Sequence, residues 1–252
     1  MFNFDAKNSD MGTSKTRENV FRFKRFEIVN SLSAMKVGTD GVLLGAWASV
    51  SAADRHPRVL DVGSGSGLIS LMLAQRFPDA SITGVDIERE ACVEARGNAD
   101  RSGWGSRIDI VCKDFAAYAA GDDVGCFDAV VSNPPFFKTE LKAPDRSRMM
   151  ARHGDGLDYA VIMRACASGL LAPDGILSMV SPADRERDIT FEMELAGLSL
   201  SRMTRVWTKS TAQAPSRLLW EMRRMKMESP PIVDDLLIGG DDYKALTGDF
   251  YL

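Results

Sequence analysis

Three glycines at alternate positions lie just after an apolar run near residue 60, and they are the first candidates for ligand chemistry. The segment reads Asp61-Val-Gly63-Ser-Gly65-Ser-Gly67. Glycines allow the backbone to turn tightly and let a ligand touch the main chain. The dinucleotide-binding fingerprint needs Gly or Ala five residues after its first glycine. Counting from Gly63 gives Leu68 and counting from Gly65 gives Ser70, so the spacing excludes a pyrophosphate-binding loop.

The same segment, of the form Asp-x-Gly-x-Gly-x-Gly, resembles motif I of S-adenosylmethionine-dependent methyltransferases, whose cofactor carries no phosphate. The plainer alternative is a glycine-rich turn that binds nothing. Two carboxylates further along favour a nucleoside ligand. Asp86, 19 residues beyond Gly67, could accept hydrogen bonds from both ribose hydroxyls, and Asp114 stands where methyltransferases commonly contact the adenine amine. Each of the two could instead cap the helix that follows it.

A further motif, Asn133-Pro134-Pro135-Phe136, resembles the Asn/Asp/Ser-Pro-Pro-aromatic motif of methyltransferases that alkylate planar nitrogens: adenine N6, cytosine N4, guanine N2 and glutamine side-chain amides. An amine conjugated to a ring is a poor nucleophile because its lone pair is delocalised. The Asn133 side-chain oxygen and the Pro134 carbonyl can both accept from its N–H groups and localise that lone pair. Phe136 offers a stacking face worth roughly 1–3 kcal/mol. Taken alone, the motif could also be an unreactive turn after a strand.

These residues need a scaffold, and the sequence predicts one in which strands and helices alternate. Short β-rich runs and helical patterns follow one another from Arg58 onward, which is typical of βαβ units. We expect strands at 58–62, 81–86, 107–114, 127–133, 175–181, 198–207 and 217–225, and helices at 68–77, 88–102, 157–171 and 183–196. The pattern predicts an α/β, Rossmann-like class I methyltransferase fold: a seven-stranded, mostly parallel sheet with helices on both faces and an antiparallel last strand. The glycines and Asn133 would then meet in the crevice at the carboxyl ends of adjacent strands.

We expect one domain with a frayed beginning. Residues 1–20 are expected to be a disordered tail, and residues 21–252 a single methyltransferase domain in which 21–57 lead into a core at 58–252. Residues 134–156, between the fourth strand and the next helix, are long, polar and without clear periodicity. Loops of that length in compact domains are usually functional or disordered.

The composition excludes several classes of protein. With 45% hydrophobic and 26% charged residues, the chain is neither disordered nor fibrous. It shows no apolar run long enough for a membrane span and no secretory signal, so a cytoplasmic location is expected. The cysteines are scattered, which predicts reduced, buried thiols and no zinc site for Cys92, Cys112, Cys126 and Cys166.

Charge is distributed unevenly along the chain. The formal net charge of −4 argues against indiscriminate nucleic-acid binding. Residues 202–226 nevertheless carry +6, residues 15–36 carry +4 and residues 227–252 carry −5. A basic face on an acidic protein is one interpretation, and solvated faces of ordinary elements are the other.

Two further segments carry a closer resemblance. Phe21-Arg-Phe-Lys-Arg-Phe-Glu-Ile is followed by Met35-Lys-Val-Gly-Thr-Asp40-Gly-Val-Leu-Leu-Gly-Ala-Trp47, and the chain closes on Tyr243-Lys-Ala-Leu-Thr-Gly-Asp-Phe-Tyr251-Leu. Together they resemble the bacterial tRNA1(Val) adenine-37 N6-methyltransferase family over about residues 21–252. The resemblance implies S-adenosylmethionine as cofactor, S-adenosylhomocysteine as product, and the adenine just 3′ of the anticodon of a valine tRNA as substrate. It places the cofactor on Asp61, Gly63, Gly65, Gly67, Asp86, Asp114 and Asn133, and the adenine on Asn133, Pro134 and Phe136. The family often has Tyr at the position of Phe136. Phe136 has the same stacking face as Tyr but lacks its hydroxyl.

Part of this signature is explained by ordinary structure. Thr39 or Asp40 is expected to cap a helix that buries three apolar residues, Leu43, Leu44 and Trp47. This explanation does not include Lys36. We hypothesise that Lys36 contacts the cofactor or a tRNA phosphate.

Contacts to RNA are predicted mainly beside Phe136. An anticodon-loop base is already unpaired, so extruding it costs less than flipping a base out of a duplex. Four basic residues are expected to bind tRNA phosphates there, Lys138, Arg146, Arg148 and Arg152. His153 is interpreted as a loop residue and His56 as exposed. We expect no metal and no membrane partner, and a monomer is favoured.

Other substrates stay open at this point. Enzymes that methylate ribosomal RNA guanine N2 or release-factor glutamine amides also use Asn-Pro-Pro-aromatic motifs. They usually carry a separate N-terminal domain, and only about 57 residues precede the first strand here. A non-catalytic homologue that binds the cofactor would also keep this fold, and the intact Asn133 argues against it.

Overall fold

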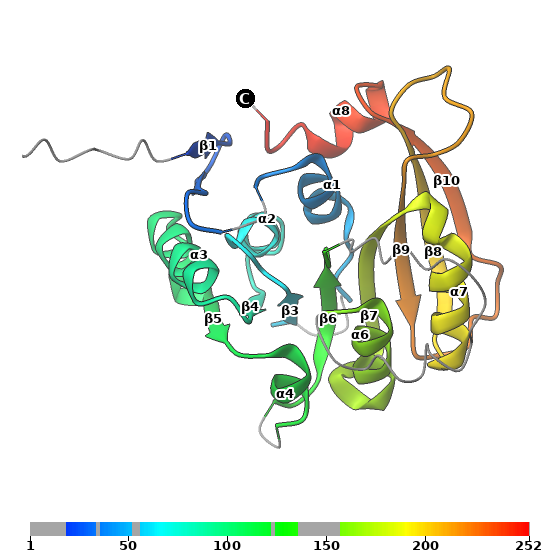
Figure 1. Cartoon of the computed structure of the whole chain (residues 1–252), viewed down its shortest axis with the longest axis horizontal. Coiled ribbons are helices and arrows are strands. Elements are labelled where there is room, and N and C mark those ends of the chain that lie inside the picture. The colour runs from blue at the N-terminus through cyan, green and yellow to red at the C-terminus, as the bar shows by residue number, and fades with distance from the viewer. Residues whose placement is uncertain (1–18, 34–35, 52–55, 122–123, 136–156, 252) are drawn as a thin grey trace, which may run out of the picture.

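The computed structural model describes residues 19–33, 36–51, 56–121, 124–135 and 157–251, and an eight-stranded sheet forms its centre (Figure 1). The strand order across the sheet is β10-β8-β9-β7-β6-β3-β4-β5. In chain order these strands are β3 (Arg58–Val62), β4 (Ser81–Asp86), β5 (Ile108–Cys112), β6 (Phe127–Ser132), β7 (Leu171–Pro182), β8 (Ser199–Trp207), β9 (Arg217–Arg223) and β10 (Ile232–Leu237). Strands β5, β4, β3, β6 and β7 are parallel neighbours, and β9 runs antiparallel between β7 and β8.

Helices cover both faces of this sheet, as the sequence predicts. The parallel strands are apolar on both faces, so successive residues of β3 pack on opposite sides: Val59 on one and Leu60 on the other. Three helices cover the side of Val59, α1 (Thr39–Trp47), α2 (Leu68–Arg76) and α3 (Arg89–Arg101). Three more cover the side of Leu60, α4 (Phe115–Ala119), α6 (Tyr159–Ala165) and α7 (Glu186–Leu195). A last helix, α8 (Asp241–Thr247), lies near α1 (Figure 1). The predicted fold class is confirmed.

The sheet has one strand more than the sequence predicts. The antiparallel strand expected near 217–225 is confirmed as β9, but β10 adds an eighth strand at the edge, parallel to β8. The sequence does not predict β10 as a strand because two acidic residues at its centre interrupt the apolar pattern. In the structure Asp234 accepts a hydrogen bond from Thr204, and Asp235 accepts from Arg205 at 2.9 Å and from Trp207 at 2.6 Å.

The helix expected over 157–171 is shorter than predicted. After α6 the chain makes one π-type turn, Cys166–Leu170, in which Gly169 has a φ of +122°. It then enters β7 at once, and both Pro173 and Gly175 lie in that strand. The register against β6 shifts in this part of β7, which accommodates a proline that cannot donate to the ladder.

The chain ahead of the sheet forms a small hairpin and a buried helix. Strands β1 (Val20–Arg22) and β2 (Glu27–Val29) pair antiparallel. Helix α1 buries every residue from Gly41 to Trp47, which confirms the expected core positions. The expected cap is wrong, because α1 starts at Thr39 after Gly38 and no side chain caps it. Asp40 lies inside the first turn, where its carboxylate binds Arg217 of β9 at 2.8 Å.

Helix α1 crosses α2 closely because Gly45 has no side chain. A Cβ at Gly45 would lie 2.7 Å from the sulfur and 3.0 Å from the Cβ of the fully buried Met72. Gly45→Ala should therefore lower the free energy of unfolding by about 1–2 kcal/mol, because overpacking outweighs the higher helix propensity of alanine. Gly97→Ala in α3 is a matched control, since its Cβ would meet only the flexible Arg101 guanidinium, and it should be neutral or stabilising. Denaturant unfolding that finds the two variants equally stable would contradict this.

The basic run at 202–226 does not form a free basic face. Its arginines bind acceptors of the protein itself: Arg202 binds Glu221, Arg205 binds Asp235, Arg217 binds Asp40, and Arg223 and Arg224 bind the carbonyls of Asp174 and Leu171. The interpretation as ordinary structural elements therefore fits this segment better than a nucleic-acid face does.

The cysteines are all free, but only Cys92 and Cys166 are buried. The expectation of buried thiols is wrong for Cys112 and Cys126, which are exposed. His56 is exposed, as expected. Within the described part of the chain, no group of three or more His, Cys, Asp and Glu side chains could hold a metal ion, and no helix is long and apolar enough to cross a membrane.

Candidate active site

The glycine loop, residues 63–67, joins β3 to α2 at the carboxyl edge of the parallel strands. Gly63, Gly65 and Gly67 have φ angles of +71°, +53° and +81°, which other residues rarely adopt. The amides of Gly63 and Ser64 both donate to the Val85 carbonyl of β4, which folds the loop back over the sheet. A Cβ at Gly65 would meet nothing within 4 Å, so the space over the loop is open at this residue.

Asp86 lies at the end of β4 and binds the glycine loop directly. Its Oδ2 accepts a hydrogen bond from the Gly65 amide at 2.8 Å, and its Oδ1 accepts from the Glu88 amide at 2.9 Å. Helix α3 starts at Arg89 with Glu88 as its N-cap residue, so Asp86 organises the start of the helix without being its cap. Each carboxylate oxygen has a second lone pair, so Asp86 can still accept from the hydroxyls of a ligand.

Asp61 is fully buried beneath the glycine loop. Its Oδ2 accepts from the amide and the hydroxyl of Ser70, at 3.0 Å and 2.7 Å, in the first turn of α2. Its Oδ1 has no hydrogen-bond partner among the described residues. Burial raises the pKa of this carboxyl to about 7, although the hydrogen bonds from Ser70 act in the opposite direction.

The raised pKa of Asp61 predicts that its contribution to stability decreases as pH rises. The folded protein holds this proton up to about pH 7, whereas the ordinary pKa is 3.8, so the folded state binds more protons between these values. The contribution is complete below about pH 4 and is lost by about pH 7, with an upper limit of about 4 kcal/mol. Asp61→Asn cannot ionise and keeps an acceptor for Ser70, so its free energy of unfolding should decrease less over this range. Parallel pH curves for the variant and the wild type in denaturant unfolding would contradict the assignment.

Asp114 caps the helix that follows it, which is the alternative to its predicted role in binding the cofactor. It follows β5, and its Oδ1 accepts from the Ala117 amide of α4 at 2.9 Å. The Lys113 amide donates to the Asp86 carbonyl at 2.9 Å, which sets the two strand ends side by side. Ile87, which the sequence analysis missed, is 64% exposed directly after Asp86 and offers an apolar surface to a planar ring.

Asn133 and Pro134 follow β6 and lie beside the glycine loop because β6 pairs with β3. The Ser132 hydroxyl donates to the Val62 carbonyl at 2.8 Å and joins the two strand ends. A Cβ at Gly41 would lie 3.9 Å from the Asn133 Nδ2 and 3.1 Å from Leu68, so the first turn of α1 lies beside both Asn133 and the start of α2. Two motifs far apart in the sequence therefore meet at one edge of the sheet.

Most of the predicted RNA-contact residues lie outside the described part of the chain: Phe136, Lys138, Arg146, Arg148, Arg152 and also His153. Lys36 is described and exposed. Its Nζ donates to the carbonyls of Asn30 at 3.0 Å and Ser33 at 3.2 Å, and these hydrogen bonds stabilise the segment after β2. The Lys36 side chain is exposed, so its positive charge lies at the surface.

Two buried side chains on α3 attach the hairpin to the glycine loop, and no pattern in the sequence signals them. Glu94 accepts hydrogen bonds from the amides of residues 31–33. Burial would raise the pKa of Glu94, but the hydrogen bonds from this segment lower it below its ordinary value. Asn98 donates to the Ser66 carbonyl at 2.8 Å and exchanges two hydrogen bonds of 2.9 Å with Val29 of β2. Asn98 therefore links the hairpin to the glycine loop.

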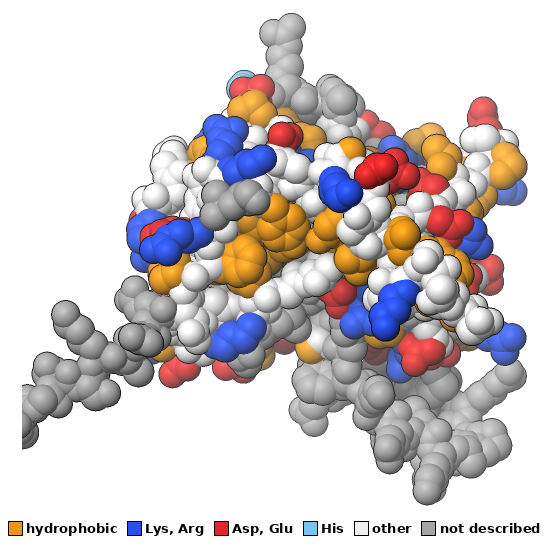
Figure 2. All heavy atoms as spheres, turned by 90° about the horizontal axis from the view of Figure 1, so that it is seen from above, with side chains coloured by type: hydrophobic (Ala, Val, Ile, Leu, Met, Phe, Trp, Pro, Cys, Tyr) orange, Lys and Arg blue, Asp and Glu red, His pale blue; other side chains and the backbone are white. Residues whose placement is uncertain are grey.

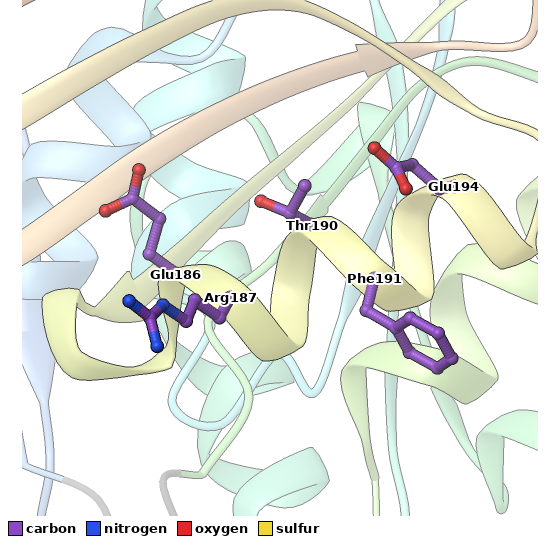
Figure 3. Close-up of a pocket in the computed structure, with 5 residues that line it drawn as sticks. All are labelled: Glu186, Arg187, Thr190, Phe191 and Glu194. Atoms are coloured by element: carbon purple, nitrogen blue, oxygen red, sulfur yellow. The ribbon is translucent and has the colours of Figure 1, made fainter.

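A hollow on α7 stands apart from these motifs. Figure 3 shows its five lining side chains, which all project from one helix: Glu186, Arg187, Thr190, Phe191 and Glu194. None of them belongs to the glycine loop, to the strand ends or to the Asn-Pro-Pro motif. The candidate site is therefore the edge where Asp61, Asp86 and Asn133 converge.

Comparison with known proteins decides the family. A family model described as the methyltransferase small domain matches residues 42–194. Curated tRNA1(Val) (adenine(37)-N6)-methyltransferases from Bacteroides fragilis and Porphyromonas gingivalis are 41% and 42% identical over 92% of this chain, covering 97% and 94% of their own lengths. One from Aeromonas hydrophila is 41% identical over 94% of this chain and 98% of its own. This chain belongs to the tRNA1(Val) (adenine(37)-N6)-methyltransferase family. It is an S-adenosylmethionine-dependent methyltransferase.

Solved structures agree with this family at the level of the fold. A predicted O-methyltransferase from Agrobacterium tumefaciens superposes with a TM-score of 0.60 at 19% identity, over 84% of this chain and 96% of its own. A candidate class I S-adenosylmethionine-dependent methyltransferase from Listeria monocytogenes gives a TM-score of 0.56 at 15% identity, over 82% of this chain and 65% of its own.

The residues of this methyltransferase at the sheet edge fit the cofactor chemically. S-adenosylmethionine presents an ammonium group and two ribose hydroxyls, all of which donate hydrogen bonds. The buried Asp61 Oδ1 is an acceptor without a partner among the described residues, and Asp86 is a carboxylate with unused lone pairs. The open space at Gly65 leaves room for a ligand against the main chain.

Proposed function

We propose that this chain transfers a methyl group from S-adenosylmethionine to the N6 amine of adenine 37 in tRNA1(Val). The identity of about 41% to curated enzymes of that name, across nearly the whole of both chains, carries the proposal. The meeting of Asn133 with the glycine loop at one edge of the sheet supports it. The enzyme acts in the cytoplasm as a monomer, with residues 21–252 as one domain.

Asn133 and Pro134 activate the amine. The Asn133 Oδ1 and the Pro134 carbonyl accept hydrogen bonds from its two N–H groups, which localises the nitrogen lone pair. The bound cofactor supplies an electrophilic methyl group on its sulfonium. An amide is too weak a base to take the proton beforehand, so the nitrogen loses its extra proton to water after the methyl group has left the sulfonium. Phe136 stacks on the adenine and holds the amine in position.

The cofactor is held by the glycine loop and the carboxylates around it. The main chain at Gly63, Gly65 and Gly67 lies against the methionine part, and the Asp61 Oδ1 accepts from its ammonium group. Asp86 accepts from the ribose hydroxyls. Asp114 contacts the adenine amine, Ile87 packs on the adenine ring, and Asn133 borders both ligands.

Basic residues beside Phe136 bind the tRNA backbone. Removing Arg146, Arg148 and Arg152 together should reduce the slope of log K against log salt for RNA binding by about 2, because each phosphate contact releases counterions. Cofactor affinity should not change. A slope that stays the same would place the phosphate contacts elsewhere on the protein.

Methyl transfer from labelled cofactor tests the substrate class. Total RNA and total protein from cells that lack the enzyme are the two acceptors. Label in the tRNA fraction of the RNA is expected, and tRNA1(Val) transcripts with guanine at position 37 should take none. Label in ribosomal RNA or in protein would instead support the alternative amino methyltransferases and overturn the proposal.

A further inference from the structure

A hollow between the N-terminal hairpin and the start of α1 is lined by groups that suit a nucleotide. Its volume is about 410 Å³, within the roughly 300–1,000 Å³ of small-ligand sites. Six of the described residues line it: Asn19, Val20, Phe21, Asn30, Lys36 and Val37. Among the described residues that line it there is no carboxylate, although the chain as a whole carries a net charge of −4. The hollow therefore favours an anionic ligand.

Each kind of lining group has a role in the recognition of single-stranded RNA. Phe21 packs against Phe23 and Tyr251 but is 39% exposed, so part of its ring can contact a base. Lys36 is fixed by the carbonyls of Asn30 and Ser33 and holds a positive charge at the rim. The exposed Asn19 has a side-chain amide that can match the edge of an unpaired base, whereas Asn30 is buried and bonded to Ser33. Figure 2 looks down on the side of the molecule that carries β1 and α8 in Figure 1, and it shows apolar side chains with Lys and Arg side chains among them.

The two segments that line the hollow, the hairpin and the chain before α1, both connect to the candidate active site. On the hairpin side, Asn98 joins Val29 to the Ser66 carbonyl of the glycine loop. On the other side, Val37 is four residues before Gly41, whose Cβ position lies 3.9 Å from the Asn133 Nδ2. Four residues of chain span at most about 14 Å, a distance that a few nucleotides of single-stranded RNA can bridge. An RNA strand with its target base at Asn133 can therefore reach the Val37 side of the hollow that Phe21 also lines.

We propose that this hollow binds a nucleotide of the anticodon loop next to the methylated adenine, with its base stacked on Phe21 and its phosphate near Lys36. The assignment rests on the proposed function and goes beyond it, because it adds a second RNA subsite on the hairpin. It also explains why α3 uses two buried polar side chains to fix the hairpin against the glycine loop.

Binding and single-turnover methylation of full-length tRNA1(Val) transcript test the subsite. Phe21→Leu keeps an apolar side chain against Phe23, whose ring centroid lies 4.8 Å away, but loses the stacking face. It should weaken RNA binding roughly 5- to 50-fold, with cofactor affinity unchanged. Phe21→Tyr keeps the face and should bind RNA like the wild type. Phe191→Leu, at a phenylalanine that is 58% exposed on α7, is the matched control and should have no effect.

Transcripts that each lack one base near adenine 37 locate the contact. For one of them, Phe21→Leu should cause no further loss of affinity, because the stacking partner is already absent. The subsite is overturned if Phe21→Leu binds wild-type transcript normally, or if its effect is the same on every abasic transcript. Wild-type enzyme that methylates the transcript while Phe21→Leu has no effect would contradict the subsite alone. Wild-type enzyme that leaves the transcript unmethylated would overturn the proposed function and this assignment with it.

Discussion

Asn133→Ala should reduce the single-turnover rate of methyl transfer by about 10²–10³-fold, or about 2.7–4 kcal/mol. The lost acceptor acts most strongly when positive charge develops on the attacking nitrogen. The effect should therefore appear in the rate at saturating substrate, while the affinity for cofactor stays close to that of the wild type. Rapid mixing of tRNA1(Val) transcript with excess enzyme and saturating cofactor measures this rate.

Asn133→Asp is the matched variant, because it keeps an acceptor oxygen at the same position. It should retain more activity than Asn133→Ala. Asn133 also lies against the first turn of α1, so unfolding of both variants must be compared with the wild type. An Asn133→Ala enzyme that turns over at the wild-type rate would exclude activation of the amine by this residue.

Asp86→Ala should weaken cofactor binding by about 1.5–3 kcal/mol, roughly 10- to 100-fold in Kd, because charged acceptors make strong hydrogen bonds with hydroxyls. Titration calorimetry with the cofactor in the absence of RNA measures the change. Unchanged affinity would mean that Asp86 only organises the glycine loop and the start of α3.

A cofactor analogue without the ribose 2′-hydroxyl separates these two roles of Asp86. The carboxylate also accepts from the Gly65 amide, so part of any loss could come from a disturbed loop. If Asp86 binds the ribose, the wild type should lose affinity for the analogue, and Asp86→Ala should then matter less. Equal losses with both ligands would assign the whole effect to the loop.

The strand ends were predictable because local signals agree there. Apolar runs mark β3, β4 and β6, followed respectively by glycines, by a carboxylate and by Asn-Pro-Pro, and parallel strands bring their carboxyl ends to one edge. This places Gly65, Asp86 and Asn133 together without any knowledge of long-range contacts. The roles of these residues in binding and catalysis stay predictions.

Other features depend on partners distant in sequence, which no local pattern contains. Asp40 resembles a helix cap in the sequence, but its carboxylate binds Arg217, which lies 177 residues away. β10 escapes prediction because its two central aspartates suggest a turn, whereas they bind side chains of β8. Glu94 resembles an exposed position of α3, and only the fold shows that it accepts hydrogen bonds from amides of the segment after β2.

The most direct test is the product analysis of one tRNA. Unmodified tRNA1(Val) is incubated with enzyme and S-adenosylmethionine and then cleaved by a ribonuclease. The mass of the anticodon-loop fragment is measured by mass spectrometry, and the fragment is then digested to nucleosides. The account predicts a gain of one methyl group in that fragment, at adenine 37, recovered as N6-methyladenosine. A methyl group on any other base, or an unmodified fragment from enzyme that binds the cofactor, would contradict it.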